Sequence, residues 1–367
     1  MESSSKKNLR GPILVNFVLA LLVVCWWVPV VGLFISSFRD RFDIQTSGWW
    51  TIFPHREWAV VAEIDPKAEG LDATGPMQIE GIEGTFEVLR EGVETPDGKR
   101  IQWIGNRRIG WIEVQEKQWT TNIDFTLENY VQVLAGKDFE YQRPDGTVEV
   151  IPGDDFWGAL FNSLAVAIPA TVIPILIAAF AAYGFAWMNF PGRRLLFVLV
   201  VALLVVPLQV ALVPLLSFYK DLGLGGTFLA VWLAHTGFGL PLATYLLFNY
   251  ISTLPRETLE SAFIDGASHF TIFIKLILPL SVPALASFAI FQFLWVWNDY
   301  LVALIFLGGN PNFEVVTMRL AGIVGDRGQD WHLLTAGAFI TMVLPLVVFF
   351  SLQRYFVRGL LAGSVKG

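Results

Sequence analysis

Cysteine and charge are both scarce in this chain of 367 residues. Cys25 is the only cysteine, which excludes a disulfide framework and a metal site built on several thiolates. Only 16% of the residues are charged, against about a quarter in soluble domains, and 54% are hydrophobic. The apolar side chains therefore require surroundings other than water.

Two sequence signatures of catalysis are also missing. The phosphate loop Gly-x-x-x-x-Gly-Lys-Ser/Thr does not occur, because Gly98-Lys99 is followed by Arg100. A metal-binding spacing such as His-Glu-x-x-His does not relate any of the four histidines, His55, His235, His269 and His332. We therefore expect that the chain neither hydrolyses ATP itself nor carries a metal site.

Negative charge is concentrated in one segment. Residues 39–155 hold 12 Lys/Arg and 23 Asp/Glu, a balance of −11, whereas the rest of the chain has a balance of +4. Short runs of β-branched and aromatic residues, separated by turn signals, lie in this segment at 85–91, 100–104 and 109–114. The pattern favours a small antiparallel β domain. A partly ordered loop stays open as the alternative, because Gly, Pro and acidic residues are frequent here.

Six apolar windows are long enough to cross a bilayer, which takes about 20 mainly apolar residues. They lie at residues 13–38, 157–188, 195–218, 228–250, 282–307 and 335–355. Each is too long for a strand of a transmembrane barrel, so helices with internally paired backbones are expected. The predicted fold class is an all-α membrane protein with six transmembrane helices. Its expected divisions are 1–38, the β-rich insert 39–155, the helical core 156–355 and a tail, 356–367.

Basic residues are distributed asymmetrically between the six windows. With the N-terminus inside, the short outer loops carry only Lys220, Arg319 and Arg327. The inner segments carry Lys6, Lys7, Arg10, Arg193, Arg194, Arg256, Lys275, Arg354, Arg358 and Lys366. This asymmetry matches the positive-inside rule and predicts that both termini are cytoplasmic and that the insert lies outside. The first window is too long for a cleavable signal, so we expect it to remain as a span.

The segment between the fourth and fifth windows, residues 251–281, faces the cytoplasm in this topology. Glu257 and Glu260 charge the first turns of a short helix and complement its dipole. Residues small enough to permit close docking follow at Ser261, Ala262, Gly266 and Ala267. Gly266 also suits a helix stop. We expect a helix, a turn and a second helix that enters the membrane through Leu278-Pro279.

This segment resembles the signature of ABC importer permeases. The family pattern is Glu-Ala-Ala, three residues, Gly, nine residues and Ile-x-Leu-Pro, and the chain matches it with Ser261 in place of Ala and Leu276 in place of Ile. The resemblance implies a coupling helix that sits in a cleft of an ATPase subunit; an amphipathic loop without a partner is the alternative. The implied coupling residues are Glu257, Glu260, Ser261, Ala262, Asp265, Gly266, Ala267, Leu278 and Pro279.

Other stretches are similar to the carbohydrate, maltose-like branch of these permeases. They lie at residues 125–130, 161–164, 297–300, 330–334 and 353–367. The long insert is more like the α-glucoside permeases, and it either contacts a binding protein or braces the bundle. The implied function is import of an α-glucoside or maltooligosaccharide. Alternatives are an ABC permease for another solute, such as a glycerol phosphate or polyol, an autonomous secondary transporter, and a membrane-anchored enzyme.

The resemblance also implies partners and a location. A second permease subunit as heterodimer partner, two ATPase subunits that bind ATP and Mg²⁺, an extracytoplasmic sugar-binding protein and membrane lipid are expected. Nucleic acid is not expected, and this chain needs no cofactor of its own. The location is the cytoplasmic membrane of a bacterium or archaeon. The basic tail either contacts the ATPase through Gly363, Lys366 and Gly367 or is simply solvated.

Polar and aromatic residues inside the spans are candidates for the substrate path. Trp295, Asn298 and Asp299 have a spacing that puts them on one helical face, with Asp299 about 22 Å along a helix that starts near Ala284. The alternative is an interfacial aromatic belt with Asp299 reaching outer water. His235 and Gln209 are further candidates, each with helix-to-helix hydrogen bonding as the alternative role.

Overall fold

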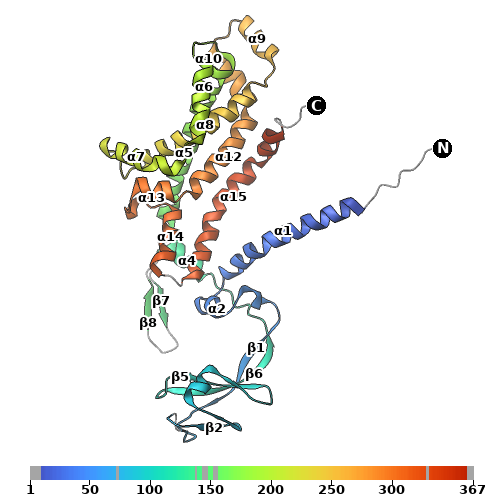
Figure 1. Ribbon diagram of the computed structural model, residues 1–367, viewed down its shortest axis with the longest axis vertical. Coiled ribbons are helices and arrows are strands. Elements are labelled where there is room, and N and C mark those ends of the chain that lie inside the picture. The colour runs from blue at the N-terminus through green and yellow to red at the C-terminus, as the bar shows by residue number, and fades with distance from the viewer. Residues whose placement is uncertain are drawn as a thin grey trace, which may run out of the picture. The chain divides into compact units, whose positions relative to one another are not determined.

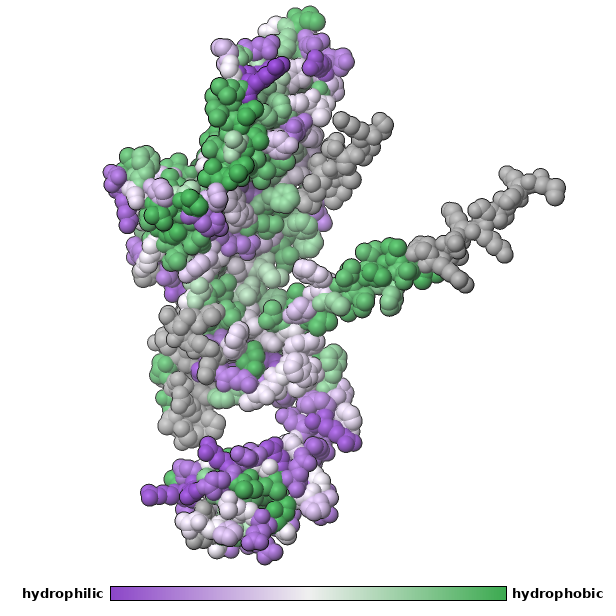
Figure 2. Space-filling view, viewed as in Figure 1, coloured by the Kyte–Doolittle hydropathy of each residue, from purple (hydrophilic) through white to green (hydrophobic). Residues whose placement is uncertain are grey.

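A computed structural model describes residues 10–71, 74–136, 139–142, 148–151, 156–327 and 330–361. Its contacts divide the chain into two compact units, Met1–Gly32 with Phe42–Phe125 and Leu33–Arg41 with Thr126–Gly367. The first unit contains most of helix α1 and a β-sheet, and the second contains the other long helices (Figure 1). Hydrophobic residues cover α1, whereas hydrophilic residues dominate the visible face of the sheet (Figure 2).

Among the residues that the structure describes, four helices are long and apolar enough to cross a membrane without interruption. They are α1 (Arg10–Ser36), α5 (Phe156–Trp187), α8 (Phe228–Ile251) and α15 (Trp331–Leu361). Two further pairs of helices pass the same test together but are bent, one by 103° and the other by 71°. With each bent pair counted as one span, the described part of the chain has six, so the predicted all-α membrane fold is confirmed.

The predicted span at 195–218 is present but bent. Helix α6 (Arg193–Ala202) tightens into the 3-10 turn η2 (Leu203–Val205), and α7 (Leu208–Asp221) then leaves at 103°. Pro207 accounts for the break, because it has no N–H and disfavours helical backbone at the preceding residue. Val206 is accordingly extended, with φ −70° and ψ 117°.

The fifth span also differs from the predicted 282–307. Helix α12 (Val282–Asn298) ends at Asn298, and α13 (Leu301–Leu307) is a separate helix. Asp299 has extended backbone between them, and its carboxylate accepts the N–H of Val302 at 2.8 Å, as a capping residue does. Two elements that were not predicted, η4 (Pro311–Phe313) and α14 (Val316–Arg327), precede α15.

Three prolines inside the spans leave backbone carbonyls without their helical donor, and side chains of neighbouring helices supply it. Pro169 and Pro174 in α5 cannot bond to the carbonyls of Ala165 and Ala170, four residues earlier. These carbonyls accept hydrogen bonds from Trp232 Nε1 of α8, at 2.9 Å, and from Gln292 Nε2 of α12, at 3.1 Å. Each freed carbonyl thus becomes a crosslink between two helices.

The same arrangement recurs in α15. Pro345 frees the carbonyl of Thr341, and Trp297 Nε1 of α12 donates to it at 3.2 Å. Trp297 and Gln292 are both buried. Because lipid offers no hydrogen bonds, a freed carbonyl inside a membrane needs a protein partner. The three pairs therefore hold α5, α8, α12 and α15 together at fixed positions along their lengths.

Two apolar clusters form the core of the helical unit. One is centred on the end of α5 that contains Phe156 and Ala167, and the other on the end that contains Ala178, Ala182 and Tyr183. Small residues on α5 and α8 line both clusters, so the two helix backbones approach closely, as is common for helix pairs in membranes. Helix α5 therefore contributes to the core along most of its length.

Two of the stretches that resemble carbohydrate permeases, 125–130 and 161–164, contain asparagines with structural roles. Asn129, in α4 (Glu128–Ala135), is buried and donates to the backbone oxygens of Ser37 and Arg39 at 2.9 Å each. Asn162 in α5 donates to the carbonyls of Asn312 and Glu314 at 2.9 Å. These amides fix the chain as it leaves α1 and the turn that precedes α14.

The first unit contains a four-stranded antiparallel sheet with the order β1-β6-β5-β4. Its strands are β1 (His55–Ile64), β4 (Val93–Glu94), β5 (Lys99–Gly105) and β6 (Gly110–Thr120). The predicted strands at 100–104 and 109–114 coincide with β5 and β6, and this sheet favours the small β domain over the partly ordered loop. The prediction of a strand at 85–91 is wrong, because Phe86 and Leu89 are buried at helical spacing in α3 (Phe86–Glu91).

Smaller elements complete both units. The hairpin β2 (Met77–Ile79) and β3 (Ile82–Gly84) packs with α3 and the inner face of the sheet around Ile101, Trp103 and Ile112. Before the sheet, α2 (Arg41–Thr46) and the 3-10 turn η1 (Trp49–Ile52) follow α1. A second hairpin in the helical unit consists of β7 (Phe139–Gln142) and β8 (Val148–Ile151).

Replacing Gln292 with Leu tests the crosslink at Pro174. The variant removes the donor to the carbonyl of Ala170, and we expect a loss of roughly 1–3 kcal/mol in the free energy of unfolding in detergent. In a Pro174→Ala background the new alanine would restore a helical N–H for that carbonyl, so Gln292→Leu should cost about 1 kcal/mol less. Equal losses in the two backgrounds would show that the freed carbonyl does not explain the contact.

Candidate functional site

A short exposed helix lies between α8 and the bent fifth span. Helix α9 (Arg256–Ile264) begins directly after Pro255, whose fixed φ of −59° suits a helix start. Glu257 and Glu260 are exposed on it, and so is Asp265, the residue that follows its last turn. Ile264 is 86% exposed, which is unusual for a large apolar side chain at the end of a polar helix. The free face of α9 therefore combines carboxylates with an apolar residue.

Gly266 ends α9 in the way that was expected. The N–H of Gly266 bonds to the carbonyl of Phe263 and that of Ala267 to the carbonyl of Ala262, both at 3.0 Å, which is the Schellman pattern. Gly266 has φ +76°, and a Cβ there would meet nothing within 4 Å. The requirement for glycine is thus conformational and not steric.

The opposite face of α9 is anchored to the spans. Leu259 is fully buried in a cluster that includes Ala182 of α5, Leu247 and Ile251 of α8, and Phe288 of α12. Ala262 and Ala267 are half-buried against the same cluster. A displacement of α9 therefore acts on three spans at once.

A polar and aromatic contact joins the turn after α9 to α5. His269 begins α10 (His269–Ile272), and its Nδ1 lies 2.8 Å from the hydroxyl of Tyr183, near the end of α5. The ring of Phe263 in α9 meets His269 edge to face at 4.9 Å. Tyr183 is buried. These contacts tie the turn to α5. They were not predicted from the sequence, because Tyr183 lies 86 residues from His269.

A bend separates the entering helix from α12. After α10, the π-helical turn η3 (Phe273–Ile277) and α11 (Leu278–Leu280) lead to a 71° bend at Ser281. Pro279 cannot donate to the carbonyl of Lys275, which accounts for irregular helix before it. The predicted second helix through Leu278-Pro279 is therefore present but broken.

A cavity of about 590 Å³ lies where the α6–α7 break meets α8 and α12. Its lining is almost wholly apolar and consists of Leu203, Leu204, Val206, Leu208, Ala211, Pro214, Leu215, Phe218, Gly237, Phe238, Pro241 and Trp295. Trp295 also meets the buried His235 edge to face, with ring centroids 5.5 Å apart. The break at Pro207 thus opens a space beside an indole ring.

The five predicted substrate-path residues are not all brought together. His235 and Trp295 are in contact at the cavity. Asn298 is exposed and donates to the carbonyl of Leu294 in its own helix at 2.7 Å, whereas Asp299 lies beyond α12 and caps α13. Gln209 is exposed in the first turn of α7. The single helical face predicted for Trp295, Asn298 and Asp299 is therefore wrong at its last residue.

Gln292 is the polar residue that the sequence analysis missed. It is buried in α12 and donates to the carbonyls of Ala170 and His235, at 3.1 Å and 3.4 Å. A polar side chain inside an apolar window was the available signal.

The predicted tail contacts Gly363, Lys366 and Gly367 lie outside the described residues.

The bent spans, the anchored loop helix and the cavity define a membrane-embedded transport subunit. A family model described as binding-protein-dependent transport system inner membrane component matches residues 174–361, about half of the chain. The chain belongs to this family, and it is a multi-pass permease subunit of an ABC importer and not an enzyme.

Two relatives are similar over nearly the whole chain. The osmoprotective compounds uptake permease protein GgtD of Synechocystis sp. is 49% identical over 352 residues, covering 96% of this chain and 91% of the relative. The alpha-glucoside transport system permease protein AglG of Rhizobium meliloti is 47% identical over 384 residues, covering 96% and 97%. A solved bacterial ABC transporter that imports alginate shares the fold, with a TM-score of 0.59 and 16% identity over 97% of this chain and 100% of that one.

Substitution of Gly266 tests the anchored turn. Gly266→Ala forces a Cβ into left-handed backbone, at a cost of about 1–2 kcal/mol, and we expect uptake by the complete importer to fall roughly 5- to 30-fold. Gly266→Asn should retain more activity, since Asn tolerates this backbone better. Uptake in proteoliposomes measures both variants.

Gly70→Ala is the matched control, because Gly70 also has a positive φ, +66°, with nothing within 4 Å of a Cβ. It should leave uptake unchanged. Equal damage by Asn and Ala at position 266, or by the control, would contradict the conformational role of Gly266.

Proposed function

We propose that the chain forms, with a second permease subunit, the path for an α-glucoside or maltooligosaccharide. The observation that carries this proposal is the 47% identity to AglG, which extends over 96% of this chain and so includes the insert. By contrast, the probable permease YurM of Bacillus subtilis aligns with 56% of this chain. Similarity to an alpha-glucoside permease is thus not confined to the helical core.

The cavity supports a sugar as the solute. Sugars present C–H surfaces that stack on aromatic rings, and Trp295 offers such a ring in the lining. The lining is otherwise apolar, so hydroxyl partners come from residues at its edge or from the second permease. Gln209 and His235 are our candidates in this chain, whereas Asn298 and Asp299 act mainly at helix ends.

Helix α9 is proposed as the surface that meets an ATPase subunit. Its exposed carboxylates, Glu257, Glu260 and Asp265, suit a basic cleft, and Ile264 suits an apolar pocket within it. Ser261 and Gly266 are exposed and small, while Ala262, Ala267 and Leu278 support the helix from below. ATP and Mg²⁺ would bind to two such partner subunits, and an extracytoplasmic binding protein would deliver the sugar.

The distribution of cations supports a cytoplasmic position for α9 and for both termini. The sheet unit then lies outside the cytoplasmic membrane of a bacterium or archaeon. In that position the sheet either meets the binding protein or braces the bundle. The acidic balance of residues 39–155 agrees with a solvated domain and not with one that contacts the inner, anionic leaflet.

A second candidate substrate is an osmoprotective solute, because GgtD, whose name states that role, is 49% identical over 96% of this chain. Uptake of labelled solutes by the complete importer in proteoliposomes, with ATP enclosed, separates the candidates. We expect α-linked di- and oligosaccharides to compete for uptake. Competition only by small osmoprotectants, polyols or glycerol phosphate would refute the α-glucoside assignment.

Trp295→Ala tests the stacking surface. We expect about a tenfold loss of sugar uptake, because a buried aromatic contact in a binding surface is worth on the order of 1–2 kcal/mol. Trp27→Ala is the control, since Trp27 is exposed on α1 and does not line the cavity. Normal uptake in Trp295→Ala, at wild-type membrane abundance, would exclude Trp295 from the path.

A further inference from the structure

The segment that follows α1 folds back onto the last turns of that helix. A Cβ added at Gly32 would lie 2.5 Å from Nε1 of Trp49, so the indole of Trp49 covers the backbone of α1 directly. Gly32 lies four residues before Ser36, the end of α1, which corresponds to about 6 Å along the helix axis. Because α1 is a membrane span, this contact places η1 at the depth where a span leaves the hydrocarbon.

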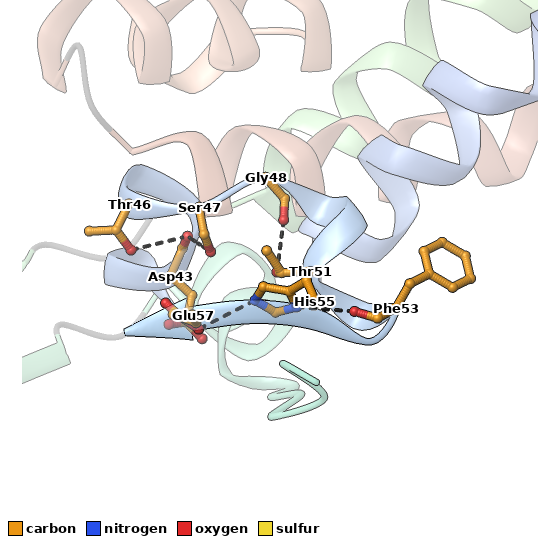
Figure 3. A network of polar contacts seen from close by, with 8 residues as sticks. All are labelled: Asp43, Thr46, Ser47, Gly48, Thr51, Phe53, His55 and Glu57. Atoms are coloured by element: carbon orange, nitrogen blue, oxygen red, sulfur yellow. Dashed lines mark hydrogen bonds and ion pairs between the residues drawn. The ribbon is translucent and has the colours of Figure 1, made fainter. Parts of the chain in front are cut away.

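A network of local hydrogen bonds fixes the conformation of this segment (Figure 3). Thr46 and Ser47 donate to the carbonyls of Phe42 and Asp43, at 2.8 Å and 3.1 Å. Thr51 donates to the carbonyl of Gly48 at 2.8 Å, and His55 Nδ1 lies 3.0 Å from the carbonyl of Phe53. The ring of Phe53 points away from these polar groups (Figure 3).

Four large apolar side chains in and beside this segment are exposed. Trp50, Phe53, Trp119 and Ile123 are 61%, 58%, 69% and 61% exposed. Two neighbouring segments carry them, one around Thr51 and the other around Asn122. The N–H of Asn122 bonds to the carbonyl of Thr51 at 2.8 Å, and Arg56 pairs with Trp119 across β1 and β6. Solvated sheets do not usually expose several aromatic side chains together.

A cation accompanies these rings. The guanidinium of Arg56 lies over the ring of Trp119, 5.5 Å from its centroid. Tryptophan and arginine together suit the boundary between acyl chains and headgroups, where an indole is half in apolar surroundings and a guanidinium reaches lipid phosphate. A water-exposed site would give the apolar side chains no such environment.

We propose that Trp50, Phe53, Arg56, Trp119 and Ile123 form an interfacial patch that docks into the lipid headgroup region at the C-terminal end of α1. The occupant is the lipid surface because Trp49 joins the patch to the exposed apolar surface of α1. Its ring meets those of Trp50 and Phe53 with centroids 6.5 Å apart in each pair, and its indole also lies over Gly32 of α1. The patch fixes the height of the sheet above the bilayer.

Fluorescence quenching in lipid nanodiscs tests the patch in the full-length chain. In a Cys25→Ser background, Phe53→Cys or Ile123→Cys is labelled with a small environment-sensitive fluorophore. Asp97→Cys, in the exposed turn between β4 and β5, is the matched control. Spin-labelled lipids report contact with the bilayer, and iodide reports contact with water.

We expect lipid quenching at positions 53 and 123 to exceed that at position 97 by at least about twofold, with iodide quenching in the opposite order. Two positions keep the test independent of whether either one tolerates the label. Iodide quenching at 53 and 123 equal to that at 97 would overturn the proposal, because the patch would then be in water. Protection from both quenchers would overturn it too, because a protein surface would then cover the patch.

Discussion

The helical unit depends on one constraint, which is that a carbonyl freed by proline inside a membrane needs a new donor. Trp232, Gln292 and Trp297 supply that donor to carbonyls of α5 and α15. Each crosslink joins two helices at a defined height, because the freed carbonyl lies four residues before its proline. Prolines that would weaken a soluble helix thus hold this bundle in register.

Helix α5 receives two of these crosslinks and connects both ends of the bundle. At one end Asn162 holds the turn before α14, and at the other Ala178, Ala182 and Tyr183 pack against the elements around α9. Because the middle of α5 is fixed to α8 and α12, we propose that motion of α9 is transmitted to the cavity beside Trp295 and is not absorbed by slipping helices. The exposed helix and the proposed solute path would then be coupled through α5.

Local signals in the sequence predicted the spans, the stop at Gly266 and the strands β5 and β6, because each depends on nearby residues. Apolar composition continues through the break at Pro207 and through the end of α12 at Asn298, and hydropathy does not report backbone direction, so the six apolar windows did not show where these helices bend or end. For the same reason the sequence left Asp299 with two readings, an intramembrane carboxylate or a carboxylate that reaches outer water. The contact of Tyr183 with His269 and the donors to freed carbonyls join residues far apart in sequence, and only the folded chain reveals them.

The hydrogen bond between Tyr183 and His269 joins α5 to the turn after α9. Removing it tests most directly whether motion of α9 is transmitted through α5. Tyr183→Phe removes one hydroxyl and keeps the ring, and Tyr245→Phe, on the exposed face of α8, is the control. The decisive measurement is the number of sugar molecules imported per ATP hydrolysed by the complete importer. We predict that this ratio falls several-fold in Tyr183→Phe while ATP hydrolysis continues. A ratio equal to that of the control would contradict transmission of motion through α5.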